Sequence, residues 1–69
     1  MKTELILLLY DEFIGGKKIS RAEFCAEHSI GERTFYRYLR EITVFLRAHR
    51  PSYIVDVAGR EGVYFLKKV

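Results

Sequence analysis

Apolar residues at helical spacing predict a helix at the start of the chain, over about residues 2–14. Four of them fall at the i, i+3, i+4 and i+8 positions of one helix face: Leu5, Leu8, Leu9 and Phe13. Gly15 and Gly16 follow, and glycine readily adopts the left-handed conformation that ends a helix. Ile6, Leu7 and Ile14 make this helix apolar around most of its circumference, which predicts a surface for a partner or for a further domain.

A second, shorter helix is predicted over about residues 20–28, followed by a turn of three residues, 29–31. Ser20 and Glu23 form a capping box, in which each side chain accepts a hydrogen bond from the backbone N–H of the other residue. Phe24 and Cys25 are expected to face inward from this helix. We expect Cys25 to be a core thiol rather than a redox sensor.

The third helix is predicted over about residues 31–49 and has the most regular apolar pattern of the chain. Spacings of four, three and four place four residues on its core face: Phe35, Leu39, Ile42 and Leu46. Phe45 flanks this stripe and is expected to widen it. Pro51 and Ser52 end the helix, because proline has no N–H to donate and clashes with the preceding turn.

The pattern changes to that of strands after Pro51. Residues 53–57 and 63–66 are rich in β-branched and aromatic side chains, and residues 59–62 supply a glycine-containing turn between them. They predict a hairpin over about residues 53–67. Residues 1–69 are therefore expected to form a single α+β domain, a three-helix winged helix-turn-helix with a C-terminal two-stranded β-hairpin wing.

The positive charge of the chain is concentrated around the third predicted helix. The formal net charge is +3 and the pI is about 9.2. Five arginines lie between residues 31 and 50, against two glutamates: Arg33, Arg37, Arg40, Arg47 and Arg50, with Glu32 and Glu41. The single cysteine excludes an internal disulfide and fits a reducing compartment. No apolar run is long enough for a signal peptide or a membrane span, so a cytoplasmic protein without a membrane partner is expected.

The solvent side of the third helix predicts binding to double-stranded DNA. With Phe35 in the core, a step of about 100° per residue puts a basic row on the opposite side: Arg33, Arg37 and Arg40, followed by Val44. Tyr36 lies between the two faces. Arginine can grip a phosphate or bond a guanine edge, and tyrosine can bond a phosphate or stack. Such a stripe also fits an ordinary solvated helix face.

Three features favour DNA over a merely solvated face. The charges of the row share one sign, the tight turn leaves the start of the helix protruding, and Arg60 stands at the hairpin tip, within reach of the DNA backbone or minor groove. In a helix-turn-helix the N-terminal residues of the second helix lie nearest the bases. The predicted DNA contacts are Glu32, Arg33, Thr34, Tyr36, Arg37, Arg40 and Arg60.

Two motifs in this arrangement also carry a family resemblance. The stretch Glu32-Arg33-Thr34-Phe35-Tyr36-Arg37, within residues 19–37, and the segment Gly62-Val63-Tyr64-Phe65-Leu66 resemble the N-terminal domain of DeoR-type and WYL-domain bacterial transcription regulators. The resemblance implies a sequence-specific regulator of the bacterial cytoplasm, on the nucleoid when bound. It implies DNA contacts by Arg33, Thr34, Tyr36 and Arg37, with Arg60 in the wing. The chain departs from the family pattern at three positions: Gly31 replaces a serine cap, Tyr38 an aspartate and Cys25 an alanine.

Other functions find less support in the sequence. There is no phosphate-binding glycine loop and no nucleophile with a matched base, so we expect neither an enzyme nor a cofactor or small-molecule site. His28 and His49 lack the neighbours a metal site needs. RNA is disfavoured because its A-form major groove excludes a helix. The alternative is a winged-helix protein–protein interaction module that uses the apolar first helix, and that helix could equally form a homodimer on paired DNA half-sites.

Overall fold

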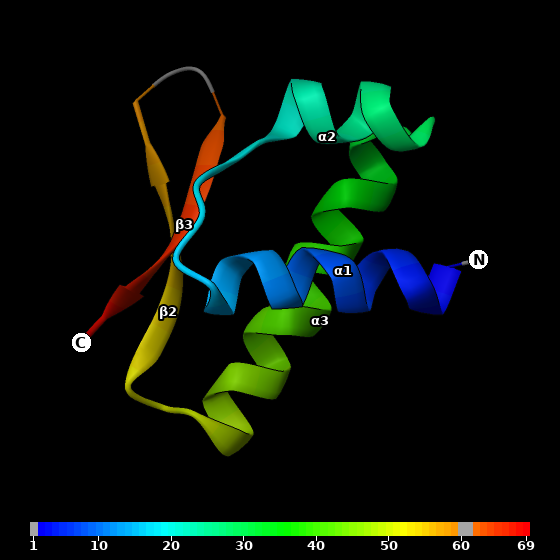
Figure 1. Cartoon of the computed structure of the whole chain (residues 1–69). Helices are drawn as coiled ribbons and strands as arrows, with labels where there is room; N and C mark the ends of the chain where they lie inside the picture. The colour runs from blue at the N-terminus through cyan, green and yellow to red at the C-terminus, as the bar shows by residue number, and fades with distance from the viewer. Residues whose placement is uncertain (1, 60–61) are drawn as a thin grey trace.

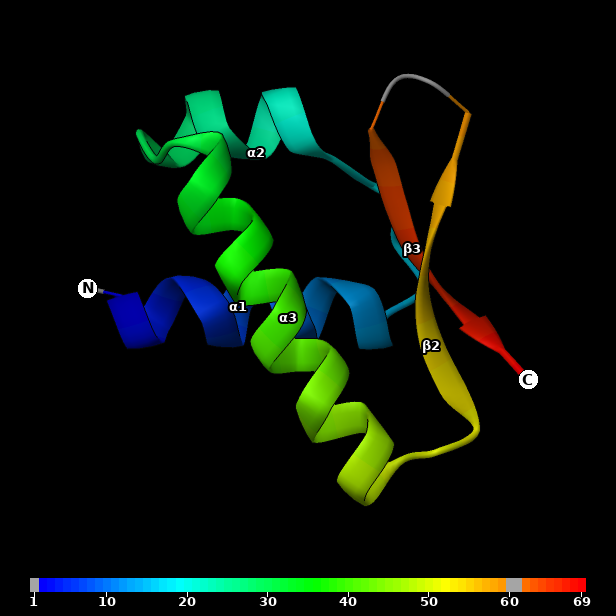
Figure 2. The ribbon, with the colours of Figure 1, turned by 180° about the vertical axis from the view of Figure 1, so that it is seen from behind.

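Three helices and three strands make up this α+β chain, whose computed structural model describes residues 2–59 and 62–69. The elements are, in order, α1 (Lys2–Ile14), β1 (Ile19–Ser20), α2 (Arg21–His28), α3 (Glu32–His49), β2 (Tyr53–Ala58) and β3 (Val63–Lys68). The helices lie where the apolar spacing predicts them. Both ribbon views show α3 crossing α1, with the sheet along one side of the pair (Figures 1 and 2).

The helix ends have the local causes that the sequence predicts. Gly16 has a φ of 85°, the left-handed conformation that turns the chain away after α1. Ser20 caps α2, because its hydroxyl accepts a hydrogen bond from the Glu23 N–H at 3.3 Å. Ser29 then takes the left-handed conformation after α2. Residues 29–31 therefore form the expected three-residue connection to α3.

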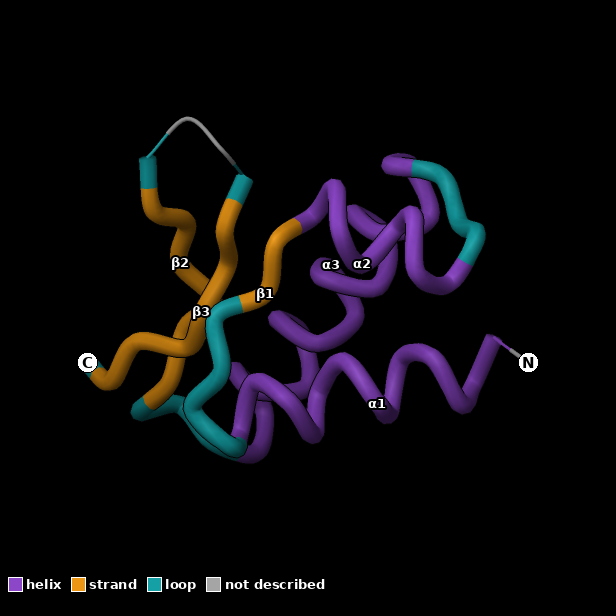
Figure 3. Tube along the Cα trace, turned by 45° about the horizontal axis from the view of Figure 1, so that its top comes forward, coloured by secondary structure: helices purple, strands orange, loops and turns teal. Residues whose placement is uncertain are grey.

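The sheet has three strands, whereas the sequence predicted a two-stranded hairpin. Its order is β1-β3-β2 and both pairings are antiparallel. β2 and β3 pair along their full length, and β1 adds two residues on the other edge, Ile19 opposite Tyr64 and Ser20 opposite Val63 (Figure 3). A strand of two residues is too short to show an alternating pattern, and Ser20 already serves as the cap of α2. The third strand therefore has no sequence signature of its own.

The core lies where α1, α2 and α3 meet the sheet. Among the described residues, nine side chains are buried in it: Leu9, Phe13, Ile19, Phe24, Phe35, Tyr38, Leu39, Ile42 and Leu46. The four residues predicted on the core face of α3 are all among them. The ring of Phe35 lies at its centre, 5.7 Å from the ring of Phe24 and 5.6 Å from that of Tyr64.

Three side chains, Leu8, Phe45 and Cys25, depart from their predicted positions. Leu8 is 38% exposed because the core takes the side of α1 that carries Leu9 and Phe13. Phe45 is 44% exposed and packs edge-on against Tyr10 beside the core instead of widening it. Cys25 is only half-buried. Tyr38, in contrast, is buried to 2% exposure, because it lies three positions after Phe35 on the same face of α3.

Candidate nucleic-acid interface

The basic face of α3 consists of Arg33, Arg37 and Arg40, which are all exposed. They lie on the side of α3 away from its buried residues, as the helical step predicts, and Val44 continues the face at 60% exposure. Figure 2 shows α3 from the side opposite α1. Because none of these three arginine side chains packs in the core, their guanidinium groups are open to solvent.

The start of α3 is held by backbone contacts rather than by a side-chain cap. The N–H of Ile30 donates to the Cys25 carbonyl at 3.0 Å, and the N–H of Phe35 donates to the Gly31 carbonyl at 3.1 Å. Gly31 is the N-cap and offers no side-chain acceptor. Glu32 is exposed in the first turn, where a carboxylate is favoured by the positive end of the helix dipole. Thr34 is half-buried.

Tyr36 is joined to α2 through Arg21, which was not among the predicted site residues. The Arg21 Nη1 donates to the Tyr36 hydroxyl at 2.6 Å, and the guanidinium carbon lies 5.8 Å from the centre of the Tyr36 ring. The Arg21 Nε lies 3.9 Å from a Glu32 carboxylate oxygen, is itself buried and has no hydrogen-bond partner among the described residues. Arg21 thus fixes the orientation of a predicted DNA contact, and the interaction with Tyr36 raises the Arg21 pKa.

Arg21 also joins this arrangement to the sheet. Its backbone N–H donates to the Gly62 carbonyl at 2.9 Å, which extends the β1–β3 pairing into the first residue of α2. Gly62 has a φ of 68°, and a Cβ there would lie 3.2 Å from the Arg21 guanidinium. We call Arg21, Glu32, Tyr36, Gly62 and Tyr64 the Arg21 cluster. Its members come from α2, α3 and the start of β3, so it locks the relative positions of these elements.

Tyr64, a member of the Arg21 cluster, and the nearby Cys25 also have raised pKa values. Burial raises the pKa of the Tyr64 phenol, and the Tyr36 hydroxyl raises it further, against the opposing charge of Arg21. Burial also raises the pKa of the Cys25 thiol, with a smaller contribution from Glu32. A raised pKa leaves less thiolate at neutral pH, which lowers the reactivity expected of this cysteine.

The second predicted element of the interface is the β2–β3 hairpin. Arg60, the predicted contact at its tip, lies outside the described residues. The ends of β2 and β3 next to the tip lie at the same end of the molecule as α2 (Figure 1). Lys18, just before β1, places its ammonium 5.9 Å from the centre of the Phe65 ring, a cation–π contact at the side of the sheet.

Two glycines near the interface are expected to respond to substitution in opposite directions. Gly62→Ala should lower the free energy of unfolding by about 1–3 kcal/mol, because it combines a left-handed φ with a Cβ that presses on Arg21. Gly31→Ser should raise the free energy of unfolding by about 0.3 kcal/mol, because serine can cap α3. The backbone at Gly31 is extended, and no atom lies within 4 Å of the new Cβ, so the substitution causes no strain. Urea denaturation followed by circular dichroism measures both. Equal effects of the two variants would show that the Gly62 conformation carries no special constraint.

The Arg21 cluster could not be found from the sequence. Arg21 and Tyr36 are fifteen residues apart, and Gly62 follows far later in the chain. An arginine after a helix cap is unremarkable by itself, and its contacts form only when α2 packs against α3 and pairs with the start of β3. Only the tertiary packing of α2 against α3 and β3 brings these residues together.

Other kinds of site are not seen in the described part of the chain. Among residues 2–59 and 62–69, no three His, Cys, Asp or Glu side chains gather where they could hold a metal ion. Within the same residues, no helix is long and apolar enough to cross a bilayer. Comparisons of the chain with profiles of known protein families, with curated proteins and with solved structures found no match. The candidate site thus rests on the geometry of this chain alone.

Proposed function

We propose that this chain is a winged helix-turn-helix domain that binds double-stranded DNA as a transcription regulator, with α3 in the major groove and the β2–β3 hairpin as the wing. The observation that carries the proposal is the exposed basic face of α3, which starts directly after the three-residue turn. A helix fits the major groove of B-form DNA, and a helix-turn-helix presents the first residues of its second helix to the bases.

The roles of the predicted contacts follow from where their side chains lie. Arg33 and Arg37 are exposed in the first half of α3 and are proposed to contact phosphates or guanine edges. Arg40 continues this row of arginines and is proposed to contact the sugar-phosphate backbone of the DNA. Tyr36 is 43% exposed, with its hydroxyl held by Arg21, so it is proposed to contact DNA in one fixed orientation. Arg60 remains a proposed contact of the wing.

A titration of labelled duplex DNA of random sequence tests this proposal. The logarithm of the binding constant should fall linearly with the logarithm of the salt concentration between about 50 and 200 mM. Arg33→Ala with Arg37→Ala should weaken binding about tenfold or more and make the slope less steep by up to about 1.8. Loss of two charged contacts produces both effects.

The matched control is Arg47→Ala with Arg50→Ala. It removes the same charge at the C-terminal end of α3, where Arg50 is the C-cap, roughly 20 Å along the helix axis. We expect it to change affinity much less. Equal losses in the two double variants would mean that only net charge attracts the DNA, and salt-independent binding would exclude an arginine-based contact.

A second candidate function, a protein–protein interaction module, is supported by one observation. Several apolar side chains of α1 and α3 are exposed, among them Leu7, Ile14 and Phe45. A protein contact through these side chains responds weakly to salt, whereas duplex binding through arginine weakens steeply. The same salt titration therefore separates the two functions.

A further inference from the structure

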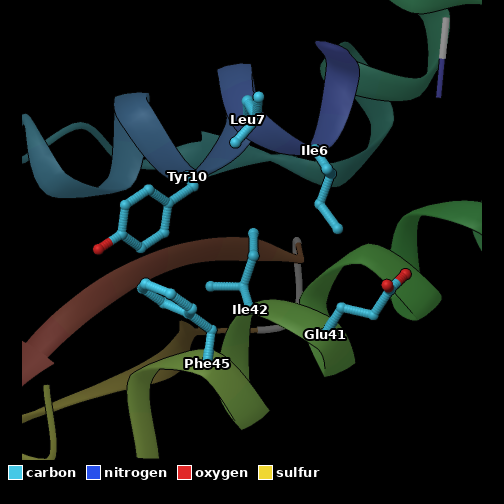
Figure 4. A pocket seen from close by; sticks show the side chains of 6 residues that line it. All are labelled: Ile6, Leu7, Tyr10, Glu41, Ile42 and Phe45. Carbon is cyan, nitrogen blue, oxygen red and sulfur yellow. The ribbon is translucent and has the colours of Figure 1, made fainter. Parts of the chain in front are cut away.

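Two apolar surfaces lie outside the candidate nucleic-acid interface, and they differ in what they specify about a partner. The first is a groove between α1 and α3, lined by six described side chains (Figure 4): Ile6, Leu7, Tyr10, Glu41, Ile42 and Phe45. The backbone groups of both walls are bonded within their helices, so the groove sets no direction for a partner chain. The second surface is the outer edge of β2, where the backbone itself is presented.

β2 is an edge strand of the sheet. In the order β1-β3-β2 it pairs with β3 on one side, and no other strand within residues 2–59 and 62–69 pairs with it. Figure 3 shows β2 on the side of the sheet farthest from α2. An edge strand presents a row of backbone N–H and C=O groups, which can act as a template for the strand of another chain.

The side chains of β2 favour pairing with a further strand. Its sequence, Tyr53-Ile54-Val55-Asp56-Val57-Ala58, is rich in β-branched residues and carries a single charge. Ile54 is 45% exposed and Val57 is 47% exposed. A six-residue segment of this composition on an exposed edge promotes aggregation unless a charged residue opposes it. Asp56 is the only charged residue of the segment.

The bonding of two N–H groups shows which residues of β2 face the outer edge. In an antiparallel pair, hydrogen-bonded residues alternate with residues that do not bond to the partner strand. The N–H of Tyr53 donates to the Arg50 carbonyl at 3.0 Å, and the N–H of Val57 donates to the Asp56 Oδ1 at 2.8 Å. Neither group is therefore directed at β3. The odd-numbered residues of β2 present their backbone groups outward.

The other end of the β2–β3 pair gives the same phase. The N–H of Val69 donates to the Ser52 carbonyl at 2.7 Å, so Ser52 bonds toward the side of β3. Even-numbered residues of β2 continue this phase and leave the odd-numbered ones to the outer edge. Val55 consequently presents its N–H outward as well.

Two of these three outward N–H groups are occupied by the chain itself. The Arg50 carbonyl takes that of Tyr53 and the Asp56 carboxylate takes that of Val57. The carboxylate lies where the carbonyl of an incoming strand would have to accept from Val57. Its negative charge also repels the partial negative charge of such a carbonyl oxygen. An incoming strand would have to displace this side chain before it could pair.

We propose that the outer edge of β2 is a strand-pairing surface that Asp56 keeps closed, and that the strand it would admit is β2 of a second copy. Antiparallel pairing about a two-fold axis at Val55 places Tyr53 of each copy opposite Val57 of the other. The outward phase is then the hydrogen-bonded phase of both strands, so one edge is complementary to itself. With the carboxylate in place, both Val57 N–H groups are occupied and the chain does not pair at this edge.

A comparison of two acidic residues tests the proposal in sedimentation equilibrium at increasing protein concentration. Asp56→Ala should raise the association constant about tenfold or more above that of the wild-type chain, because two hydrogen bonds are gained in each dimer. Asp11→Ala is the matched control, since it removes the same charge from an exposed position on α1. It should associate no more than the wild type. The experiment contains no DNA, so its result is independent of the proposed DNA binding.

A second substitution tests whether the association uses the β2 edge. Proline has no N–H to donate and is tolerated on an edge strand where that N–H faces solvent. Asp56→Ala combined with Val57→Pro should therefore return to the association constant of the wild type. Circular dichroism shows whether each variant is folded, and the comparison of Asp56→Ala with Asp11→Ala decides the proposal even where the proline variant unfolds.

Three results would overturn the proposal. The first is an Asp56→Ala chain that associates no more than the wild type, which would mean that the carboxylate does not close the edge. The second is an equal rise in Asp56→Ala and Asp11→Ala, which would assign the effect to net charge. The third is a dimer of folded chains that persists with Val57→Pro, which would place the contact on another surface.

Discussion

Phe35→Ala is expected to cost about 3–5 kcal/mol of folding free energy and to leave a large part of the chain unfolded. The Phe35 side chain is fully buried between Phe24 and Tyr64, so its removal leaves a cavity where α2, α3 and β3 meet. A domain of this length has a total stability of about 3–10 kcal/mol. The loss from a single cavity at this position can therefore equal most of the free energy of unfolding of the domain.

The control for this variant is Phe45→Ala, which removes the same group from the same helix. Because Phe45 is 44% exposed, we expect a loss of about 1 kcal/mol or less. Urea denaturation, followed by far-UV circular dichroism at low protein concentration, measures both variants. Comparable losses at the two positions would contradict the arrangement of the core around Phe35.

Tyr38→Asp is expected to have a similarly large effect. Tyr38 is buried in this chain, and a carboxylate placed there would be out of water and lacks a cationic partner in the apolar core. The loss should reach about 3–5 kcal/mol. A low pH protonates the introduced carboxyl and should restore part of the stability, since the neutral form is less costly to bury.

Tyr38→Phe is the matched control, since it keeps the ring and its volume. We expect its stability to stay within about 1.5 kcal/mol of the wild type. The measurement is urea denaturation at neutral and at acid pH. A stable aspartate variant with an exposed carboxylate would contradict the burial of Tyr38 in the core.

The candidate DNA interface depends on the same core. Phe35 and Tyr36 are adjacent, and one is buried while the other is held by Arg21 on the surface. Any shift of α3 in the core therefore moves the basic face relative to the hairpin. The Arg21 cluster counters such a shift because it bonds α2 to α3 by a side chain and to β3 by the backbone.

Several features of this protein are decided by the sequence alone, because they depend on neighbours in the chain. The Ser20 cap specifies where α2 starts, and the left-handed Gly16 specifies where α1 ends. The apolar side of α3 is set by the spacing of Phe35, Leu39, Ile42 and Leu46. The same spacing puts Arg33, Arg37 and Arg40 on the opposite side. Local geometry is sufficient for each of these statements.

Tertiary structure alone decides the remaining features, because they require residues that are distant in sequence to meet. β1 forms only because β3 pairs with it at Ile19 and Ser20. Arg21 links α2 to α3 and to β3 only when Tyr36 and Gly62 lie next to it. Both Leu8 and Leu9 fit the apolar face of α1, and the packing of α3 buries the second and exposes the first. Periodicity defines the apolar side of a helix, but the partner that covers it sets which residues of that side are buried.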